Sequence, residues 1–219
     1  TMVTVVDGET FLRDFCSPER LPGWFGKLPG LGDFAHRRLP EDFRERWDHW
    51  LQTGLLQLRR QHADWTAHYL QSPLWFFALA PQVAGARPWI GVLMPSVDGV
   101  GRYFPFTIAS ELAVPLDTLS HSAWTALARW WRHAAHCALT ALDQDLDAAG
   151  VDALLARAPV DAAAEPLGMP EWPEDGQSLW LTDLGSAPTS ALRTAGLPRS
   201  ARFDRLFGFD DAADAPPLM

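Results

Sequence analysis

The sequence predicts an α+β fold, in which an antiparallel sheet of about five strands packs against two long Trp-rich helices and short peripheral helices. Two long segments carry apolar residues at spacings of three and four, which is typical of helices with one buried face. Three apolar runs follow one another at short intervals and indicate an antiparallel meander. The 219 residues include 11 Trp, so we expect aromatic side chains to fill much of the core.

The length of the chain fits one domain. We expect residues 1–22 to form an N-terminal extension, residues 23–211 to form the single domain, and residues 212–219 to form a loose C-terminal tail. No internal repeat or low-complexity tract divides the sequence.

The first part of the domain is predicted to hold one strand and two helices. The strand covers Gly23–Leu28 and ends at a turn, Pro29–Gly32. A long helix begins near Pro40, because proline suits a helix start and the two carboxylates after it face the positive end of the helix dipole. A short helix is expected at about Ala63–Leu70. The buried stripe of the long helix is predicted to be Phe43, Trp47, Trp50, Leu51, Leu55 and Leu58.

Three consecutive strands and a second long helix follow. The predicted strands are Leu74–Leu79, Trp89–Met94 and Phe104–Leu112. The helix runs from about Ser122 to Ala148, and Gly150 is its expected stop. Its buried stripe is predicted to be Trp124, Leu127, Trp131, Ala135, Ala138, Leu142 and Leu146.

The C-terminal part alternates short elements with loops. A short helix is expected at Val151–Ala158, followed by a long loop, Pro159–Gly176, that is rich in Pro, Gly and acidic residues. Ser178–Thr182 is a predicted strand, Leu192–Leu197 is expected to be irregular, and Ala201–Phe207 is expected to form a last short helix.

Charge, hydropathy and cysteine content narrow the functional class. The net charge of −9 argues against nucleic-acid binding, which depends on clustered Lys and Arg. No apolar run approaches the roughly 20 residues that span a bilayer, so no membrane insertion is expected. Cys16 and Cys137 lie far apart, and we expect both to be reduced thiols in a cytoplasmic protein.

The segment Met94–Pro105 interrupts two predicted strands with charged and turn-forming residues. Its Asp98-Gly99 dipeptide is favoured in two-residue hairpin turns, which would bring Ser96, Asp98 and Arg102 together at one end of the sheet. Two interpretations stay open. The three side chains can bond to each other and to their own backbone in a purely structural turn, or they can present a surface to a partner.

Catalytic, metal and phosphate sites are weakly supported. Ser96 lacks the Gly-x-Ser-x-Gly elbow of a hydrolase serine, and no His is an evident base for it. In Gly26–Asp33 the lysine precedes the glycines and an aspartate follows them, unlike a phosphate-binding loop. His133 and His136 share a helical face but lack nearby ligands. We therefore expect no cofactor and no metal.

Motifs spread over about residues 23–209 carry a resemblance to a known family. They are Gly23-Trp24-Phe25-Gly26-Lys27-Leu28-Pro29-x-x-Gly32-Asp33-Phe34, Trp47-Asp48-x-Trp50-Leu51, Tyr69-Leu70-x-x-Pro73-x-Trp75, Trp89-x-Gly91-Val92-x-Met94-Pro95-Ser96-Val97-Asp98, Gly101-Arg102-Tyr103-Phe104-Pro105 and, more weakly, Phe203-Asp204-Arg205-Leu206-Phe207. Together they resemble the TagF family of type VI secretion-associated proteins, with Met94–Pro105 the most specific part.

The resemblance implies a bacterial, cytoplasmic, non-enzymatic accessory protein that represses the assembly or activity of the type VI secretion system after translation. It implies binding to the forkhead-associated scaffold protein of that system. The expected partner-binding residues are Lys27, Asp33, Ser96, Asp98, Arg102 and Tyr103. Two alternatives are a small-ligand-binding protein or hydrolase-like enzyme with a pocket at Ser96, Asp98 and Arg102, and a structural component of the apparatus.

Overall fold

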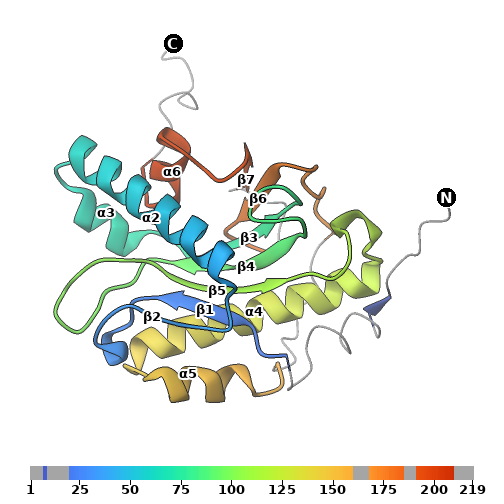
Figure 1. Ribbon diagram of the computed structural model, residues 1–219, viewed down its shortest axis with the longest axis horizontal. Coiled ribbons are helices and arrows are strands. Elements are labelled where there is room, and N and C mark those ends of the chain that lie inside the picture. Colours follow the sequence, from blue (N-terminus) through green and yellow to red (C-terminus); the bar gives the residue numbers. More distant parts are fainter. Residues whose placement is uncertain (1–6, 9–19, 160–167, 185–190, 210–219) are drawn as a thin grey trace, which may run out of the picture.

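The computed structural model describes residues 7–8, 20–159, 168–184 and 191–209, and its α+β architecture has three layers, with helices on both faces of one sheet (Figure 1). The strands are all antiparallel and follow the order β2-β1-β5-β4-β3-β6-β7. Their bounds are Gly23–Gly26 for β1, Ala35–Arg37 for β2, Trp75–Leu79 for β3, Trp89–Met94 for β4, Phe106–Glu111 for β5, Gln177–Leu181 for β6 and Ala191–Ala195 for β7.

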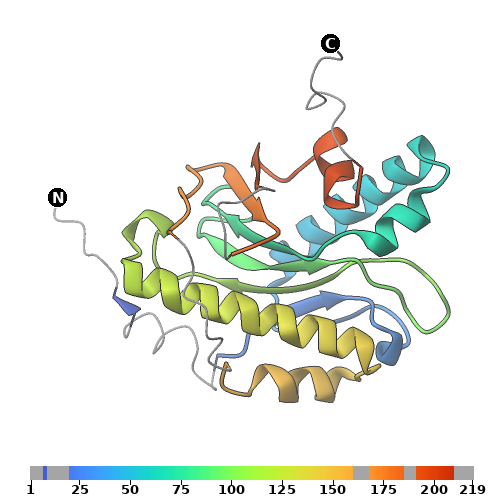
Figure 2. The same ribbon diagram turned by 180° about the vertical axis from the view of Figure 1, so that it is seen from behind.

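The two long helices cover opposite faces of the sheet. Figure 2 shows α4 lying along one face with α5 beside it, while α2, α3 and α6 lie on the other. The described α-helices are α2 (Glu41–Gln61), α3 (Trp65–Gln71), α4 (His121–Asp143), α5 (Ala148–Leu155) and α6 (Ala201–Leu206). Two short 3₁₀ helices of three residues each are η1 (Pro29–Leu31) and η2 (Leu116–Thr118).

The central strands are apolar on both faces because each face is covered by helices. In β3, Phe76 and Ala78 belong to the core beneath α4, whereas Trp75, Phe77 and Leu79 belong to the core beneath α2. The predicted buried stripe of α2 is confirmed, since all six of its residues are buried. The predicted meander is confirmed too, because β3 pairs with β4 and β4 pairs with β5.

Tryptophan side chains connect the layers as well as filling them. Five indole N–H groups donate across elements or within a strand: Trp24 to Asp152 Oδ1, Trp47 to Thr107 Oγ1, Trp50 to the Pro198 carbonyl, Trp75 to the Leu206 carbonyl and Trp180 to Ser178 Oγ. A buried indole usually takes such an acceptor, and the four bonds that join different segments help to fix those segments relative to one another.

Within the described residues the sheet has seven strands rather than about five, because two short edge strands do not follow the predicted pattern. The three residues of β2 are polar or half-exposed and pair with β1 through Trp24 and Arg37. The segment predicted as irregular contains β7, in which Leu192 and Thr194 face inward and their neighbours face outward. An edge strand that buries one face is recognised in a sequence by the alternation of apolar and polar residues, and five residues are too few for that pattern to be clear.

The predicted helix stop at Gly150 is wrong. Helix α4 ends at Asp143, and Asp145 has a left-handed φ of 49°. Asp147 then caps α5 by accepting the N–H of Gly150 at 2.8 Å. Leu142 and Leu146 pack on the same core on either side of this break, so the apolar spacing in the sequence continues past the true end of α4.

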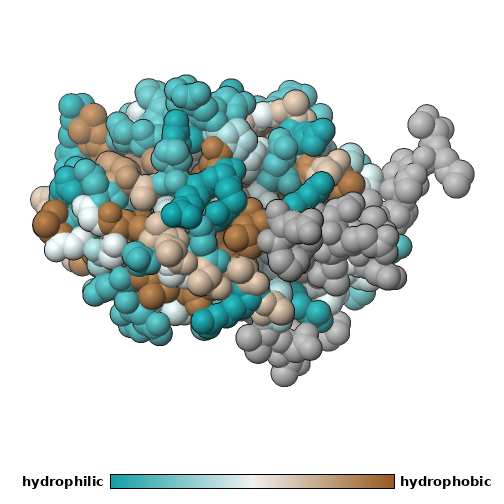
Figure 3. Space-filling view, turned by 60° about the horizontal axis from the view of Figure 1, so that its bottom comes forward, coloured by the Kyte–Doolittle hydropathy of each residue, from teal (hydrophilic) through white to brown (hydrophobic). Residues whose placement is uncertain are grey.

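The chain ends carry little of the described structure. Most of the predicted N-terminal extension, including Cys16, and the whole predicted C-terminal tail lie outside the described residues. None of the helices that the structure describes is long and apolar enough to cross a membrane. In the view of Figure 3, hydrophobic residues form several separate patches among hydrophilic ones on the described surface.

Candidate functional site

The β4–β5 hairpin ends in a loop of residues 98–102, which extends beyond the sheet (Figure 1). A bridge between Val97 and Tyr103 closes the base of this loop. The predicted two-residue turn at Asp98-Gly99 is wrong, because the Gly101 N–H bonds to the Asp98 carbonyl at 3.0 Å and the Asp98 N–H bonds to the Arg102 carbonyl at 3.1 Å. The left-handed φ that a two-residue turn places on its central residues falls on Gly101 instead, at 82°.

The Asp98 carboxylate organises the loop from within. Its Oδ1 accepts the N–H groups of Val100 at 3.1 Å and Arg102 at 2.8 Å. Its Oδ2 accepts the Lys27 ammonium at 2.9 Å and the Arg102 Nε–H at 2.6 Å. Burial alone raises the pKa of Asp98, but these four hydrogen bonds outweigh it and hold the pKa well below its usual range. Asp98 is therefore an ionised acceptor whose oxygens are engaged within the chain.

Lys27 reaches Asp98 because of the glycine before it. Gly26 has a φ of 134°, and a Cβ placed there would lie 2.2 Å from the Pro105 carbonyl oxygen. Only glycine allows the two backbones to approach so closely. The Lys27 ammonium, 5% exposed, also lies 3.7 Å from Asp33 and over the Phe34 ring, 4.5 Å from its centroid. A buried cation thus joins the β1–β2 loop to the β4–β5 loop.

Ser96 is a structural residue in this geometry. Its side-chain hydroxyl donates to the Lys27 carbonyl at 2.6 Å, and it is 2% exposed. The Tyr69 hydroxyl accepts the Ser96 N–H and donates to the Ser96 carbonyl, both at 2.9 Å. Burial raises the pKa of Tyr69 far above its usual range, so its hydroxyl stays protonated. Ser96 therefore fixes three segments of the chain at the base of the hairpin.

The exposed side of the cluster consists of Asp33, Arg102 and Tyr103. The side chain of Arg102 is 52% exposed and that of Asp33 is 70% exposed, and Arg102 Nη2 lies 3.5 Å from Asp33 Oδ1. Tyr103 is half-buried and makes edge contacts with Trp65 and Tyr69 at centroid distances of 5.3 and 5.7 Å. Its carbonyl accepts Arg59 Nη2 at 3.3 Å, and Arg59 lies over the Trp65 ring at 4.6 Å.

A groove of about 730 Å³ runs between this cluster and α2, and we call it the hairpin groove. Its described lining residues are Lys27, Phe34, His49, Gln52, Thr53, Leu55, Leu56, Arg59, Trp65, Arg102, Tyr103 and Phe104. Phe34 and Leu56 are 46% and 49% exposed, and Val100 at the loop tip is 77% exposed. Three of the described lining side chains are cationic and none is a carboxylate. Lys27 and Arg102 are paired with Asp98 and Asp33 beside the groove, so Arg59 is the lining cation that forms no ion pair among the described residues.

The structure brings together all six residues predicted for the site, but it divides them. Ser96, Asp98 and Lys27 are buried and hold the hairpin, whereas Asp33, Arg102 and Tyr103 face outward. The prediction did not include the groove residues from α2 and α3, nor Phe34. The cation of Arg59 and the i, i+4 pair Trp65 and Tyr69 were the available signals, but spacing alone does not distinguish a groove from a core.

The described part of the chain offers neither a cluster of metal ligands nor a reactive thiol. Within the described ranges, no group of three or more His, Cys, Asp or Glu side chains could hold a metal ion. Cys137 is buried, as expected from its apolar surroundings, and burial raises the pKa of its thiol to about 12. A thiol with that pKa is a poor nucleophile at neutral pH.

Comparisons with known proteins agree with this fold. Residues 23–158 match the family described as "TagF N-terminal domain, Type VI secretion system-associated". The crystal structure of PA0076 from Pseudomonas aeruginosa PAO1 is similar, with 31% sequence identity and a TM-score of 0.67 over 90% of this chain and 98% of that chain. A search of the curated proteins found no match.

Proposed function

Because the chain belongs to the TagF N-terminal domain family and is therefore a type VI secretion system-associated protein, we propose that it represses that system by binding a protein partner through the hairpin groove. The proposed partner is the forkhead-associated scaffold protein, and the proposed setting is the cytoplasm. In this proposal the protein acts after translation, without catalysis, by occupying a surface that the apparatus needs for assembly or firing.

The observation that carries the proposal is the composition of the hairpin groove. Exposed Phe34 and Leu56 offer apolar contacts, and Arg59 and Arg102 flank them without a lining carboxylate among the described residues. Aromatic and Arg side chains are enriched among the residues that dominate protein interfaces, and complementary charge fixes the register of a partner. The groove therefore suits a segment of the partner that combines apolar and acidic residues.

The internal contacts of Asp98 and Ser96 give this surface its rigidity. Asp98 holds the Arg102 guanidinium at one nitrogen and leaves Nη2 directed toward Asp33 and the Gly32 carbonyl, 3.3 Å away. A preorganised Arg loses less side-chain entropy when a partner binds. We therefore assign Asp98, Ser96 and Lys27 to positioning, and Arg102, Tyr103, Arg59, Phe34 and Leu56 to contact.

The hydrolase-like alternative has less support, because the Ser96 hydroxyl donates to a backbone carbonyl and Ser96 does not line the groove. A structural role in the apparatus makes a different prediction. A structural component remains in purified assembled particles at fixed stoichiometry, whereas a repressor that binds the scaffold is found with that protein when assembly is blocked.

The test measures binding of the purified chain to the purified forkhead-associated scaffold by calorimetry, with secretion measured in cells that carry the same variants. Leu56→Ser and Arg59→Gln are expected to weaken binding about tenfold or more, the effect of losing a central interface contact of ~1.4 kcal/mol. Matched controls are Leu139→Ser on α4, where Leu139 is 51% exposed, and Arg60→Gln on α2.

The outcomes separate the parts of the proposal. If the wild-type chain does not bind the scaffold, the partner is wrong. If Leu56→Ser and Arg59→Gln bind as well as the controls do, the groove is wrong. If both variants lose binding but secretion stays repressed, then binding through this groove is not the cause of repression.

A further inference from the structure

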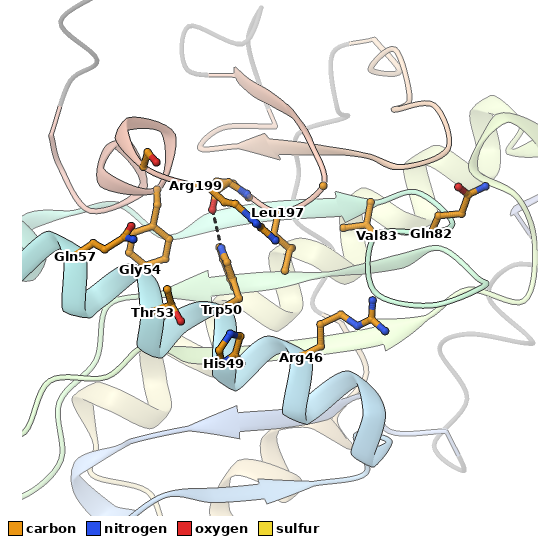
Figure 4. Close-up of a pocket in the computed structure, with 14 residues that line it drawn as sticks. Arg46, His49, Trp50, Thr53, Gly54, Gln57, Gln82, Val83, Leu197 and Arg199 are labelled. Carbon is orange, nitrogen blue, oxygen red and sulfur yellow. Dashed lines mark hydrogen bonds between the residues drawn. The ribbon is translucent and has the colours of Figure 1, made fainter.

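A second pocket lies on the other side of α2, and we call it the α2 pocket. Its volume is about 500 Å³, and it is bounded by α2, the β3–β4 loop and the segment that precedes α6 (Figure 4). A volume of roughly 300–1,000 Å³ is typical of sites for small molecules. His49 and Thr53 line both this pocket and the hairpin groove, so the two lie on neighbouring faces of one helix.

The charge of the α2 pocket is unbalanced. Arg46 and Arg199 line it, and no carboxylate does so among the described residues. Figure 4 shows the Arg46 side chain extending from α2 toward Gln82 and Val83, and the Arg199 side chain on the opposite wall beside Leu197. Neither guanidinium forms an ion pair or side-chain hydrogen bond within the described part of the chain. The pocket therefore carries two positive charges that no carboxylate among the described residues balances, in a protein of net charge −9.

The floor of the pocket is apolar and firmly held. It consists of the buried side chains of Trp50, Val83, Leu197 and Phe203. The Trp50 indole donates to the Pro198 carbonyl at 2.7 Å, which ties the segment before α6 to α2. Gly54 permits this packing, because a Cβ there would lie 2.3 Å from the Phe203 ring. Arg199 is therefore carried on a segment whose position relative to Arg46 is fixed.

The backbone of the pocket wall is strained at two places. Gln82 has a φ of 74° and Ser200 a φ of 52°, and both line the pocket. Outside glycine, only two other described residues, Arg38 and Asp145, have a left-handed φ. Such conformations are unfavourable for residues other than glycine, and they concentrate at ligand clamps and active sites. Their presence on two walls of the cavity is a second observation, independent of its charge.

From this combination we propose that the α2 pocket binds a small organic anion with a doubly charged oxygen head and an apolar body. A guanidinium pairs with a carboxylate or phosphate through two parallel hydrogen bonds, and two guanidinium groups match a dianion. The head lies between Arg46 and Arg199, with polar contacts from Thr53, Gln57 or Gln82, and the body covers the apolar floor. This site adjoins the partner surface proposed above and shares His49 and Thr53 with it, but Arg46 and Arg199 line the α2 pocket alone.

The test is isothermal titration calorimetry of the full chain at low salt with three probes. Phenyl phosphate and phthalate carry the phosphate and dicarboxylate forms of the head, and benzyl alcohol is the uncharged control. Arg46→Gln and Arg199→Gln are each expected to weaken binding about tenfold or more, since a hydrogen bond to a charged group contributes ~1.5–3 kcal/mol. Both side chains are exposed, so the variants are expected to unfold at the wild-type temperature.

Arg60→Gln serves as the matched control, because Arg60 is an exposed cation of the same helix that does not line the pocket. Binding of either anion that depends on Arg46 and Arg199 and survives Arg60→Gln supports the proposal, and the tighter probe identifies the head group. The proposal is overturned if neither anion binds at concentrations on the order of 10 mM, ten times a ~1 mM Kd. Equal weakening in all three variants also overturns it, because that result indicates general charge attraction.

Discussion

Tyr69→Phe tests whether the base of the hairpin is held by a single buried hydroxyl. Tyr69 is fully buried, and its hydroxyl bonds to both backbone groups of Ser96. Burial keeps this phenol neutral at working pH, so it acts as donor and acceptor together. The substitution removes one oxygen atom and leaves the ring, with its packing against Phe207 and Tyr103, in place.

The expected loss follows from which groups remain without a partner. The Ser96 carbonyl retains the Phe104 N–H as a donor at 3.1 Å, but the Ser96 N–H loses its acceptor while it stays buried. One orphaned buried donor costs about 1–3 kcal/mol. For a domain of this size each kcal/mol lowers Tm by roughly 2–4 °C, so the expected decrease is about 2–12 °C.

Urea unfolding and amide hydrogen exchange measure the two consequences. The free energy of unfolding is expected to fall by the amount above, and the Ser96 amide is expected to exchange faster than its neighbours in β4. The other tyrosine of the chain supplies the control. Tyr103→Phe removes a hydroxyl with no hydrogen bond among the described residues and is expected to change stability by less than about 0.5 kcal/mol. A Tyr69→Phe protein as stable as Tyr103→Phe, with unchanged Ser96 exchange, would refute this account of the hairpin.

Three further predictions concern other parts of the molecule. Asp98→Asn is expected to lower the free energy of unfolding at pH 7, and this loss is expected to shrink below about pH 4. The reason is that a carboxyl whose folded pKa is depressed contributes stability that is lost as the pH falls toward that pKa. Urea titrations that give equal losses at pH 7 and pH 3 contradict this prediction. Gly26→Ala is expected to lower the free energy of unfolding by at least about 1–3 kcal/mol, because the new Cβ would meet the Pro105 carbonyl. Gly32→Ala is expected to cost less, since its φ is also positive, at 76°, but its Cβ would meet nothing within 4 Å. Equal melting temperatures for the two variants argue against a close approach at Gly26. Cys137 is expected to react with a thiol reagent only on unfolding, because burial raises its pKa to about 12; labelling of the folded chain at the rate of a free thiol is the contrary result.

The elements that the sequence predicts well are those whose whole pattern is local. Helix α2 combines an acidic start with a stripe from Phe43 to Leu58, and every residue of that stripe is buried. The three central strands are continuous apolar runs, and they pair in the predicted order. Long regular segments repeat their signal over several turns or residues, so errors at one position matter little.

Short elements and caps are predicted less well, because their signals are brief or ambiguous. Strand β2 has three residues with no clear alternation. The sequence predicts that Gly150 ends α4, yet the cap at Asp147 places Gly150 inside α5. Glycine serves at helix ends and within helices alike, and the capping hydrogen bond decides between the two.

The fold class, the two Trp-rich helical faces and the motifs of the family could all be predicted from the sequence, since these depend on residue order and periodicity. It also indicated that Ser96, Asp98 and Arg102 meet at one hairpin. It did not indicate which of them is buried. That depends on Lys27 and Tyr69, which lie 71 and 27 residues from their partners Asp98 and Ser96.

Which side chains are exposed depends on the packing of the whole fold. The hairpin groove combines side chains from the β1–β2 loop, α2, α3 and the β4–β5 hairpin, and the α2 pocket joins Arg46 to Arg199 across most of the chain. No local pattern encodes such surfaces, because their residues come together only when the sheet brings distant segments side by side. The physical reason is that burial and charge balance are properties of three-dimensional neighbours, whereas helix and strand formation are largely properties of neighbours in sequence.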